Sequence, residues 1–331
     1  MAGAVVALGL AGGATWGLSG DDDVKRYEWL PADSAPKDFP VEVLSGRVLT
    51  ADGGVVPIPD GRVTGQGWGL PGAIVIPAAT GHPPPEALAV RWLSLVEDAV
   101  WQARVELPAA RVVELLERGH IDAATGERVP YDTLVVGLAP GGHVSVWLSG
   151  GAWVERVATG AAERLELSWE EVRPGSTIPR GQYVATRLSG TKASGAAPEP
   201  GLFERRAAQH PWTFETRSGN PVDLLHLETW DGERMSYDLD RVVPEREARG
   251  LPRFARLAWK AGDGTAKSAH ITFAFDGVEA AFARIAEEPG VPVLAFDVAD
   301  TDREIDVVLR VPGAVLPLDE VAEVKIYRRR Q

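Results

Sequence analysis

The stretch TLVVGLAPGGHVSVWL, residues 133–148, decides the fold class, because it reads as two strands joined by a tight turn. Apolar and β-branched residues fill both arms, 133–138 and 143–148, as they do in strands buried in a sheet. Between the arms, Pro140 fixes its φ angle, and the two glycines that follow supply the positive φ of a tight turn. The stretch therefore predicts an antiparallel hairpin.

Strand-like alternation continues on the N-terminal side of this hairpin. Apolar side chains fall on one face in residues 87–92 and again in 101–107. Between these strands and the hairpin, the apolar spacing of 112–116 predicts a helix that begins near Pro108 and ends at Gly119. Helices are few and do not alternate regularly with strands. The pattern predicts an α+β fold, in which mostly antiparallel sheets are each covered on one face by one main helix.

The same order of elements recurs later in the chain. Pro252 and Trp259 each lie 167 residues after their counterparts, Pro85 and Trp92. The expected elements of this second part are strands 252–259 and 269–275, a helix around 278–285, and strands 293–298 and 304–311. A recurrence over this distance predicts the duplication of a domain-sized unit, and chance agreement between two α+β domains is the alternative.

A chain of 331 residues exceeds what one hydrophobic core usually serves, so two domains are expected. The strongest shift in composition is a run of small and helix-breaking residues, 189–201, which is typical of an exposed linker. We therefore predict a leader at 1–23, a first domain at 24–188 and a second domain at 202–331.

The leader is apolar and rich in glycine through residue 18, too short and too diluted to predict a membrane span. It is similar to the apolar core of an export signal whose basic leading region is missing. Residues 8–12 resemble the segment before the lipidated cysteine of bacterial lipoproteins, and Gly13 stands where that cysteine would be. We expect a periplasmic or envelope-associated protein without a lipid at residue 13. A flexible leader with no targeting role is the alternative.

Composition and charge exclude several function classes. The absence of cysteine excludes disulfides, thiolate metal sites and thiol catalysis. A formal net charge of −13 without a basic stripe disfavours nucleic acid as a partner. No histidine lies at metal-site spacing from another histidine or a carboxylate, and no glycine-rich phosphate loop opens a helix. We predict no metal, no cofactor and no enzymatic activity.

An acidic pair, Glu97 and Asp98, lies between two predicted strands and close to Trp92 and Trp101. Carboxylates flanked by tryptophans are typical of carbohydrate or cation sites. Neighbouring side chains in an extended segment point to opposite sides, however, so the two need not share one site. A turn with charged tips is the favoured interpretation.

Two further segments are candidate binding surfaces. Trp68 lies in the glycine-rich loop 66–72, where its side chain is a candidate exposed anchor. His143 follows the turn Pro140-Gly141-Gly142, which predicts that its ring sits at the mouth of a strand.

The first part of the chain carries motifs of a known family. In order, they are Pro84-Pro85, LAVRWLS (88–94), Glu97-Asp98, Leu107-Pro108, Thr125-Gly126, Tyr131-Asp132 and VGLAPGGHVSVWLSG (136–150). Over residues 40–155 the chain resembles the proteobacterial envelope lipoproteins grouped as domain of unknown function 2931. It departs from them in lacking the lipidation cysteine. The second part lacks both the acidic pair and the Pro-Gly-Gly turn, so a site carried by those motifs would be present once.

The resemblance implies no established reaction. Members of the family are often found beside genes for type VI secretion effectors, which implies an immunity protein that binds and neutralises a toxin. The partner would be a basic or membrane-active protein, and the membrane would be contacted only through a leader or anchor. The residues expected to bind it are Trp68, Glu97, Asp98, Trp101, Pro140, Gly141, Gly142 and His143. The alternatives are an envelope structural or glycan-binding module and, less favoured, a hydrolase that uses Glu97, Asp98 or His143.

Overall fold

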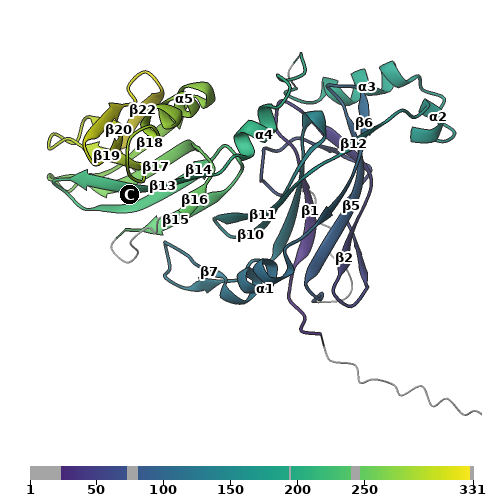
Figure 1. Cartoon of the computed structure of the whole chain (residues 1–331), viewed down its shortest axis with the longest axis horizontal. Coiled ribbons are helices and arrows are strands. Elements are labelled where there is room, and N and C mark those ends of the chain that lie inside the picture. Colours follow the sequence, from purple (N-terminus) through teal and green to yellow (C-terminus); the bar gives the residue numbers. More distant parts are fainter. Residues whose placement is uncertain (1–23, 73–80, 194, 240–246, 329–331) are drawn as a thin grey trace, which may run out of the picture.

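A computed structural model describes residues 24–72, 81–193, 195–239 and 247–328. Two β-rich halves lie side by side, and helices are confined to their margins and to the connection between them (Figure 1). The helices of the described residues are α1 (Ala109–Arg118), α2 (Trp169–Val172), α3 (Arg180–Ser189), α4 (Leu202–Ala207), α5 (Phe275–Ile285) and the 3₁₀ turn η1 (Pro140–Gly142). The predicted leader, 1–23, lies outside the described residues.

The strands of the described part form three main sheets and one short hairpin. The nine-stranded sheet has the order β1 (Leu30–Ser34), β9 (Thr133–Leu138), β10 (His143–Gly150), β11 (Trp153–Ala161), β15 (Arg234–Asp238), β14 (Val222–Thr229), β17 (Pro252–Lys260), β18 (Ala266–Phe273), β22 (Ala322–Arg328). The second sheet has the order β12 (Glu163–Leu165), β6 (Ala99–Glu106), β5 (Pro85–Ser94), β2 (Val41–Thr50), β3 (Val55–Pro57), with β4 (Val63–Thr64) also paired to β2. The third has the order β16 (Glu247–Arg249), β13 (His210–Ser218), β19 (Val293–Val298), β20 (Ile305–Val311), β21 (Ala314–Pro317), and β7 (His120–Ile121) pairs with β8 (Arg128–Val129).

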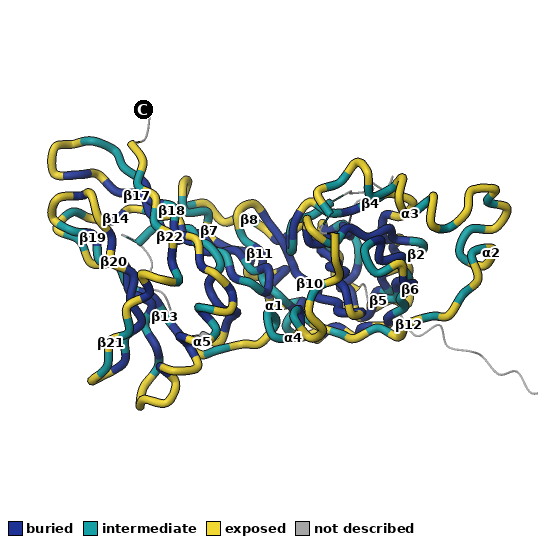
Figure 2. Tube along the Cα trace, turned by 90° about the horizontal axis from the view of Figure 1, so that it is seen from above, coloured by how far each residue is buried: buried dark blue, intermediate teal, exposed yellow. Residues whose placement is uncertain are grey.

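Each half is a sandwich of two sheets around its own core. In the first half, β9 and β10 face β2, β5 and β6, and their apolar side chains form one cluster with those of α1. Trp92 at its centre is fully buried, and burying one large apolar side chain contributes roughly 1.5–3 kcal/mol. In the second half, the sheet of β14, β17 and β18 encloses a second cluster with β13, β19, β20 and α5. Buried residues accordingly follow the strands, and exposed ones gather in the loops (Figure 2).

The two halves have the same topology. The order β1-β9-β10-β11 of the first half matches β13-β19-β20-β21 of the second, and the pairs β1·β9 and β13·β19 are both parallel. The order β3-β2-β5-β6-β12 likewise matches β15-β14-β17-β18-β22. Each half also places a helix, α1 or α5, between equivalent strands along the chain. A duplicated unit would give this correspondence.

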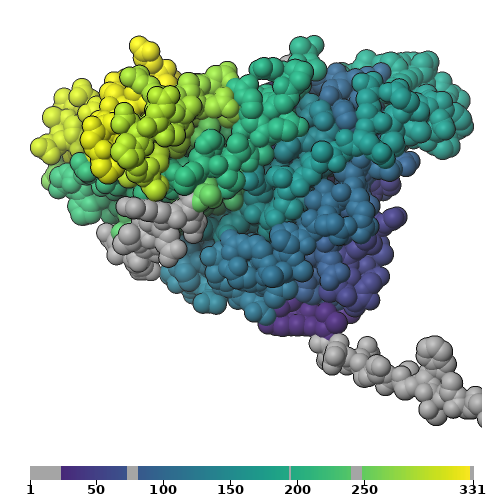
Figure 3. All heavy atoms as spheres, in the orientation of Figure 1, coloured from purple at the N-terminus to yellow at the C-terminus, as the bar shows by residue number. Residues whose placement is uncertain are grey.

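The nine-stranded sheet crosses from one half to the other. Strand β11 of the first half pairs with β15 of the second through the residues Val154 and Arg234. The halves therefore meet along a sheet edge, and their atoms are in contact in the space-filling view (Figure 3). Within the predicted linker, 189–201, α3 ends at Ser189, and the described residues between it and α4, 190–193 and 195–201, form neither helix nor strand.

The expected fold class is confirmed, since the chain is rich in antiparallel strands with few helices. The hairpin appears as β9, η1 and β10, and the helix expected from Pro108 to Gly119 is α1, which Gly119 ends with a φ of 59°. The structure differs in giving each half two sheets instead of one. Alternation along a strand reveals which face is buried, but it does not reveal which strands share a sheet. No helix within the described ranges has both the length and the apolar character needed to span a membrane.

Candidate functional site

Two turns of the first half meet at one end of its sandwich. The turn between β5 and β6 carries Glu97, and the turn between β9 and β10 is η1. One carboxylate oxygen of Glu97 accepts a hydrogen bond from the backbone N–H of Gly141 at 3.0 Å. The other accepts one from Nε1 of Trp101 at 3.2 Å. One side chain thus links two turns that belong to different sheets.

The glycines of η1 have different surroundings, although φ is positive at both (73° and 79°). A Cβ atom on Gly142 would lie 2.7 Å from the ring of Trp101, so only glycine allows the turn to pack this closely. A Cβ atom on Gly141 would meet no other atom within 4 Å, and this residue is exposed. Trp101 therefore fixes the buried side of the turn, while Gly141 faces solvent.

Asp98 is the exposed neighbour of Glu97 and has a φ of 45°. Its carboxylate accepts a hydrogen bond from Nε of Arg180 at 2.6 Å, and its backbone carbonyl accepts a second from the same guanidinium at 2.6 Å. The two acidic side chains lie in one turn and have different partners, and of the two only Asp98 is exposed. The contact fixes the start of α3 against the β5–β6 turn.

We call the surface formed by Glu97, Asp98, Trp101 and the turn Pro140–Gly142 the tip surface. It unites six of the eight residues that the sequence predicts to bind a partner. The remaining two, Trp68 and His143, lie in a separate aromatic cluster.

His143 is the first residue of β10, at the mouth of that strand, and its side chain is buried, with 5% of its surface exposed. Its Nε2 lies 2.9 Å from the hydroxyl of Ser145. Burial lowers the pKa of His143 to about 4, with a smaller opposing effect of the Glu204 carboxylate, so the ring is neutral at physiological pH. The ring is therefore a packed, hydrogen-bonded part of the sheet.

Trp68 is half-buried, so the expected exposed anchor is absent at this position. Its ring packs edge-on against Trp147, with centroids 4.9 Å apart, and against Phe203 of α4 at 5.3 Å. The carbonyls of Trp68 and Gly69 accept hydrogen bonds from Arg234 of the second half, at 3.2 and 3.4 Å. The loop therefore fastens the two halves together. Each of the ten tryptophans that the structure describes is buried or half-buried.

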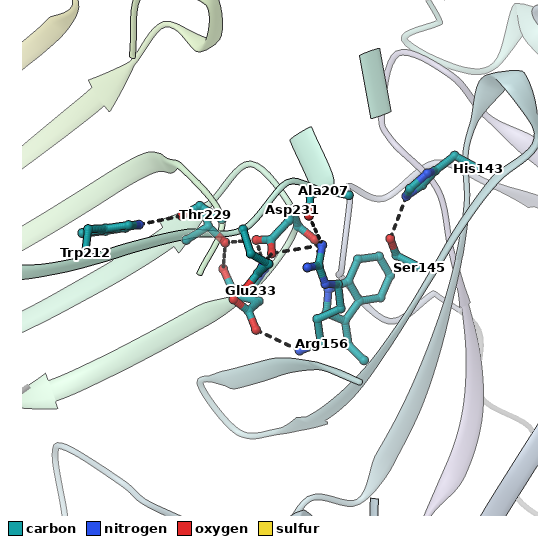
Figure 4. A network of polar contacts seen from close by, with 11 residues as sticks. His143, Ser145, Arg156, Ala207, Trp212, Thr229, Asp231 and Glu233 are labelled. Carbon is teal, nitrogen blue, oxygen red and sulfur yellow. Dashed lines mark hydrogen bonds and ion pairs between the residues drawn. The ribbon is translucent and has the colours of Figure 1, made fainter. Parts of the chain in front are cut away.

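A buried polar network that the sequence motifs do not predict lies at the joint between the halves (Figure 4). Arg156 of β11 places its guanidinium 3.4 Å from the carboxylate of Asp231 and donates a hydrogen bond to the carbonyl of Ala207 at 2.7 Å. The backbone N–H of Arg156 donates to Glu233 at 3.0 Å. Asp231 also accepts hydrogen bonds from Thr229 and Gln209.

Burial dominates the electrostatics of this network. It raises the pKa of Asp231, while the charge of Arg156 acts in the opposite direction. Burial together with the neighbouring charge of Asp231 raises the pKa of Glu233 to about 8. At neutral pH Glu233 therefore retains a proton beside Arg156, between the halves. The sequence gives only a weak indication of this network, because Arg156 lies 75 positions or more from both carboxylates.

The fold and the tip surface define a class: a β-rich protein of two sandwiches that share one sheet, with a hydrogen-bonded pair of turns at one end. Within the described residues, no three His, Asp or Glu side chains gather as ligands of a metal would. A family model described as "Protein of unknown function (DUF2931)" matches residues 18–195, more than half of the chain. The chain belongs to this family. No curated protein and no solved structure matches it.

Proposed function

We propose that the chain is a non-catalytic binding protein of the bacterial envelope, which acts as an immunity protein by binding and neutralising an effector of type VI secretion. The partner is a basic protein that docks on the tip surface. Membership of the family supports this proposal, because the resemblance implies that genes of its members often lie beside genes for effectors.

The observation that carries the proposal is the bridge from Glu97 to both Gly141 and Trp101. Because of this bridge, the exposed Gly141 is held in one conformation before any partner arrives. A surface ordered in advance loses little conformational entropy on binding, so more of its contact energy appears as affinity. Exposed backbone with no side chain at Gly141 also permits close approach by a partner.

The negative net charge of the chain also supports a basic partner at the tip surface. The net charge of −13 attracts a basic partner over long distances and speeds the encounter. At the tip surface the charge of Asp98 is already paired with Arg180, and Glu97 is occupied by its two hydrogen bonds. Long-range charge therefore directs the approach, while shape at the tip surface determines which partner fits.

The test is co-purification of the full chain with each effector encoded beside its gene, at low salt, followed by titration calorimetry. The change Gly141→Arg adds a long side chain to the exposed turn and should weaken binding by roughly tenfold or more, as disruption at the centre of an interface does. The matched control is Gly61→Arg, since Gly61 is exposed, has a φ of 72° and has no atom within 4 Å of an added Cβ. Failure to bind any neighbouring effector, or equal losses in the two variants, contradicts the proposal.

We also propose that the second half is a diverged copy of the family unit. The family match ends at residue 195, and the support comes from the matching topology of the two halves. In this interpretation the tip surface occurs once, because Asp300-Thr301-Asp302 replaces the Pro-Gly-Gly turn in the second half. A crystal structure of a family member without the second half should superpose on both halves, and a different strand order in that structure would contradict duplication.

A further inference from the structure

The outer face of the second sheet carries a hollow of about 650 Å³. Strands β2, β5 and β6 of this sheet lie in the part of the first half that is farther from the second half (Figure 1). The floor of the hollow is formed by small side chains such as Ala89 of β5. Three arginines line it, Arg47 of β2, Arg91 of β5 and Arg104 of β6, against one carboxylate, Glu163 of β12. A gathering of three cations around an alanine is unexpected on a chain with a net charge of −13. We call this site the arginine hollow.

The strand register explains how the arginines converge. Ala89 pairs with Arg47 on one side and with Arg104 on the other, so the two arginines flank the alanine in a single row. Neighbouring strands lie roughly 4.8 Å apart, which places the two Cα atoms about 10 Å from each other. Arg91 stands two residues along the same strand and thus on the same face as Ala89. Their side chains surround a space that no larger side chain fills.

The positive charge of the hollow is only weakly neutralised by the protein. Both Nε and Nη2 of Arg91 donate to the amide oxygen of Gln102, at 3.1 and 2.7 Å, and a neutral amide cancels no charge. The amide of Gln102 in turn donates to Glu163 at 3.3 Å.

The two flanking arginines, Arg47 and Arg104, are also available to bind an anion. Arg104 pairs with Glu106 at 2.8 Å, but both side chains are more than half exposed, and such pairs contribute little. Among the residues that the structure describes, none pairs with the exposed guanidinium of Arg47. The hollow therefore presents three guanidinium groups able to donate hydrogen bonds to an anion.

We propose that the arginine hollow binds a small anion that carries two or more phosphate or carboxylate groups. The planar guanidinium group matches the oxygens of both groups with two parallel hydrogen bonds. Because the three arginines stand on three different strands, a ligand with several anionic groups contacts more than one guanidinium group at once, whereas a small monoanion contacts fewer. The volume of the hollow fits a small molecule of this kind.

This site is separate from the tip surface. Trp101 of the tip surface and Gln102 of the hollow are neighbours on β6, and successive side chains of a strand point to opposite faces of the sheet. Binding in the hollow and binding of a protein partner at the tip surface therefore engage different faces, and each is testable without the other.

The test is isothermal titration of the full chain at low salt with inorganic pyrophosphate, with citrate and with acetate. We expect one saturable site for pyrophosphate or citrate, no measurable binding of acetate, and weaker binding as salt screens the arginines. Tighter binding of pyrophosphate assigns the site to phosphate groups, and tighter binding of citrate assigns it to carboxylates. Absence of binding by both polyanions, or equally strong binding of acetate, overturns the proposal.

The double variant Arg47→Gln, Arg104→Gln should weaken binding by roughly tenfold or more, since it removes two charged hydrogen-bond donors. Both positions are exposed, and an unchanged thermal unfolding midpoint shows that the variant remains folded. The matched control is Arg256→Gln, which changes an exposed arginine on β17, the strand equivalent to β5. An unchanged affinity in the double variant, or an equal loss in the control, contradicts the assignment.

Discussion

The carboxylate of Glu97 accepts a hydrogen bond from the backbone N–H of Gly141 at 3.0 Å and so joins the β5–β6 turn to the β9–β10 turn. In the second half the equivalent turns are also joined, but the turn that supplies the carboxylate and the turn that supplies the N–H are exchanged. There, the carboxylate of Asp302, in the β19–β20 turn, accepts a hydrogen bond at 3.2 Å from the backbone N–H of Gly262, in the turn after β17. In both halves a carboxylate holds the two sheets of a sandwich together at one end, although the carboxylate comes from different turns.

The change Glu97→Ala should lower the free energy of unfolding by about 1–2 kcal/mol, because two hydrogen bonds to a charged group are lost. Denaturant titration measures the change. Glu166→Ala is the matched control, since Glu166 is 85% exposed on the same half and its single ion pair should contribute about 0.5 kcal/mol or less. Equal effects of the two variants would show that the bridge does not stabilise the sandwich.

Gly137 lies in β9 where the rings of Trp147 and Trp68 cover the backbone. An added Cβ would lie 2.9 Å from the Trp68 ring and closer still to Trp147. We expect Gly137→Ala to lower the free energy of unfolding by about 1–3 kcal/mol, through overpacking of this aromatic cluster. Gly181→Ala in α3, where the added atom meets nothing, should instead stabilise by about 0.5–1 kcal/mol. A neutral Gly137→Ala would contradict the close packing.

The hairpin, the helix from Pro108 and several strands of the second half, such as β17 and β19, could be predicted from sequence, because each depends on local signals. Proline and glycine determine a turn, and apolar spacing determines which face of an element is buried. The division of each half into two sheets could not be predicted in this way. It depends on which strands pair, as β11 does with β15 across the joint, and pairing between distant strands leaves no local pattern.

The candidate site was predictable to a similar extent. Glu97, Trp101 and the turn at Gly141 stand out as motifs, and the structure brings them together. The burial of Trp68 was not predictable, because the groups that contact it come from the distant strand β10, from α4 and from the second half. A glycine-rich loop has the same sequence whether it faces solvent or a neighbouring sheet.

His143 should make the fold sensitive to acid. Burial lowers its pKa to about 4 in the folded chain from an ordinary value of 6.5, so the unfolded chain binds a proton first. Its contribution to stability is therefore full above pH 6.5 and is lost progressively as the pH falls from 6.5 through 4. Proton NMR should give a titration midpoint near 4 for the His143 ring in the folded chain. The same ring should titrate near 6.5 in urea, and a midpoint near 6.5 in both states would contradict this burial effect.

Glu233, at the joint between the halves, should give the free energy of unfolding the opposite dependence on pH. Burial and the charge of Asp231 raise its pKa to about 8 from an ordinary 4.5, so the folded chain retains a proton that the unfolded chain has released. The free energy of unfolding should fall as the pH rises from 4.5 to 8, by at most about 1.4 kcal/mol per unit. Glu233→Gln keeps the side chain neutral, so its stability relative to the native chain should increase from pH 5 to pH 8 in denaturant titrations. Glu166→Gln, an exposed control, should show no such trend, and a parallel pH dependence of Glu233→Gln and the native chain would place the proton elsewhere.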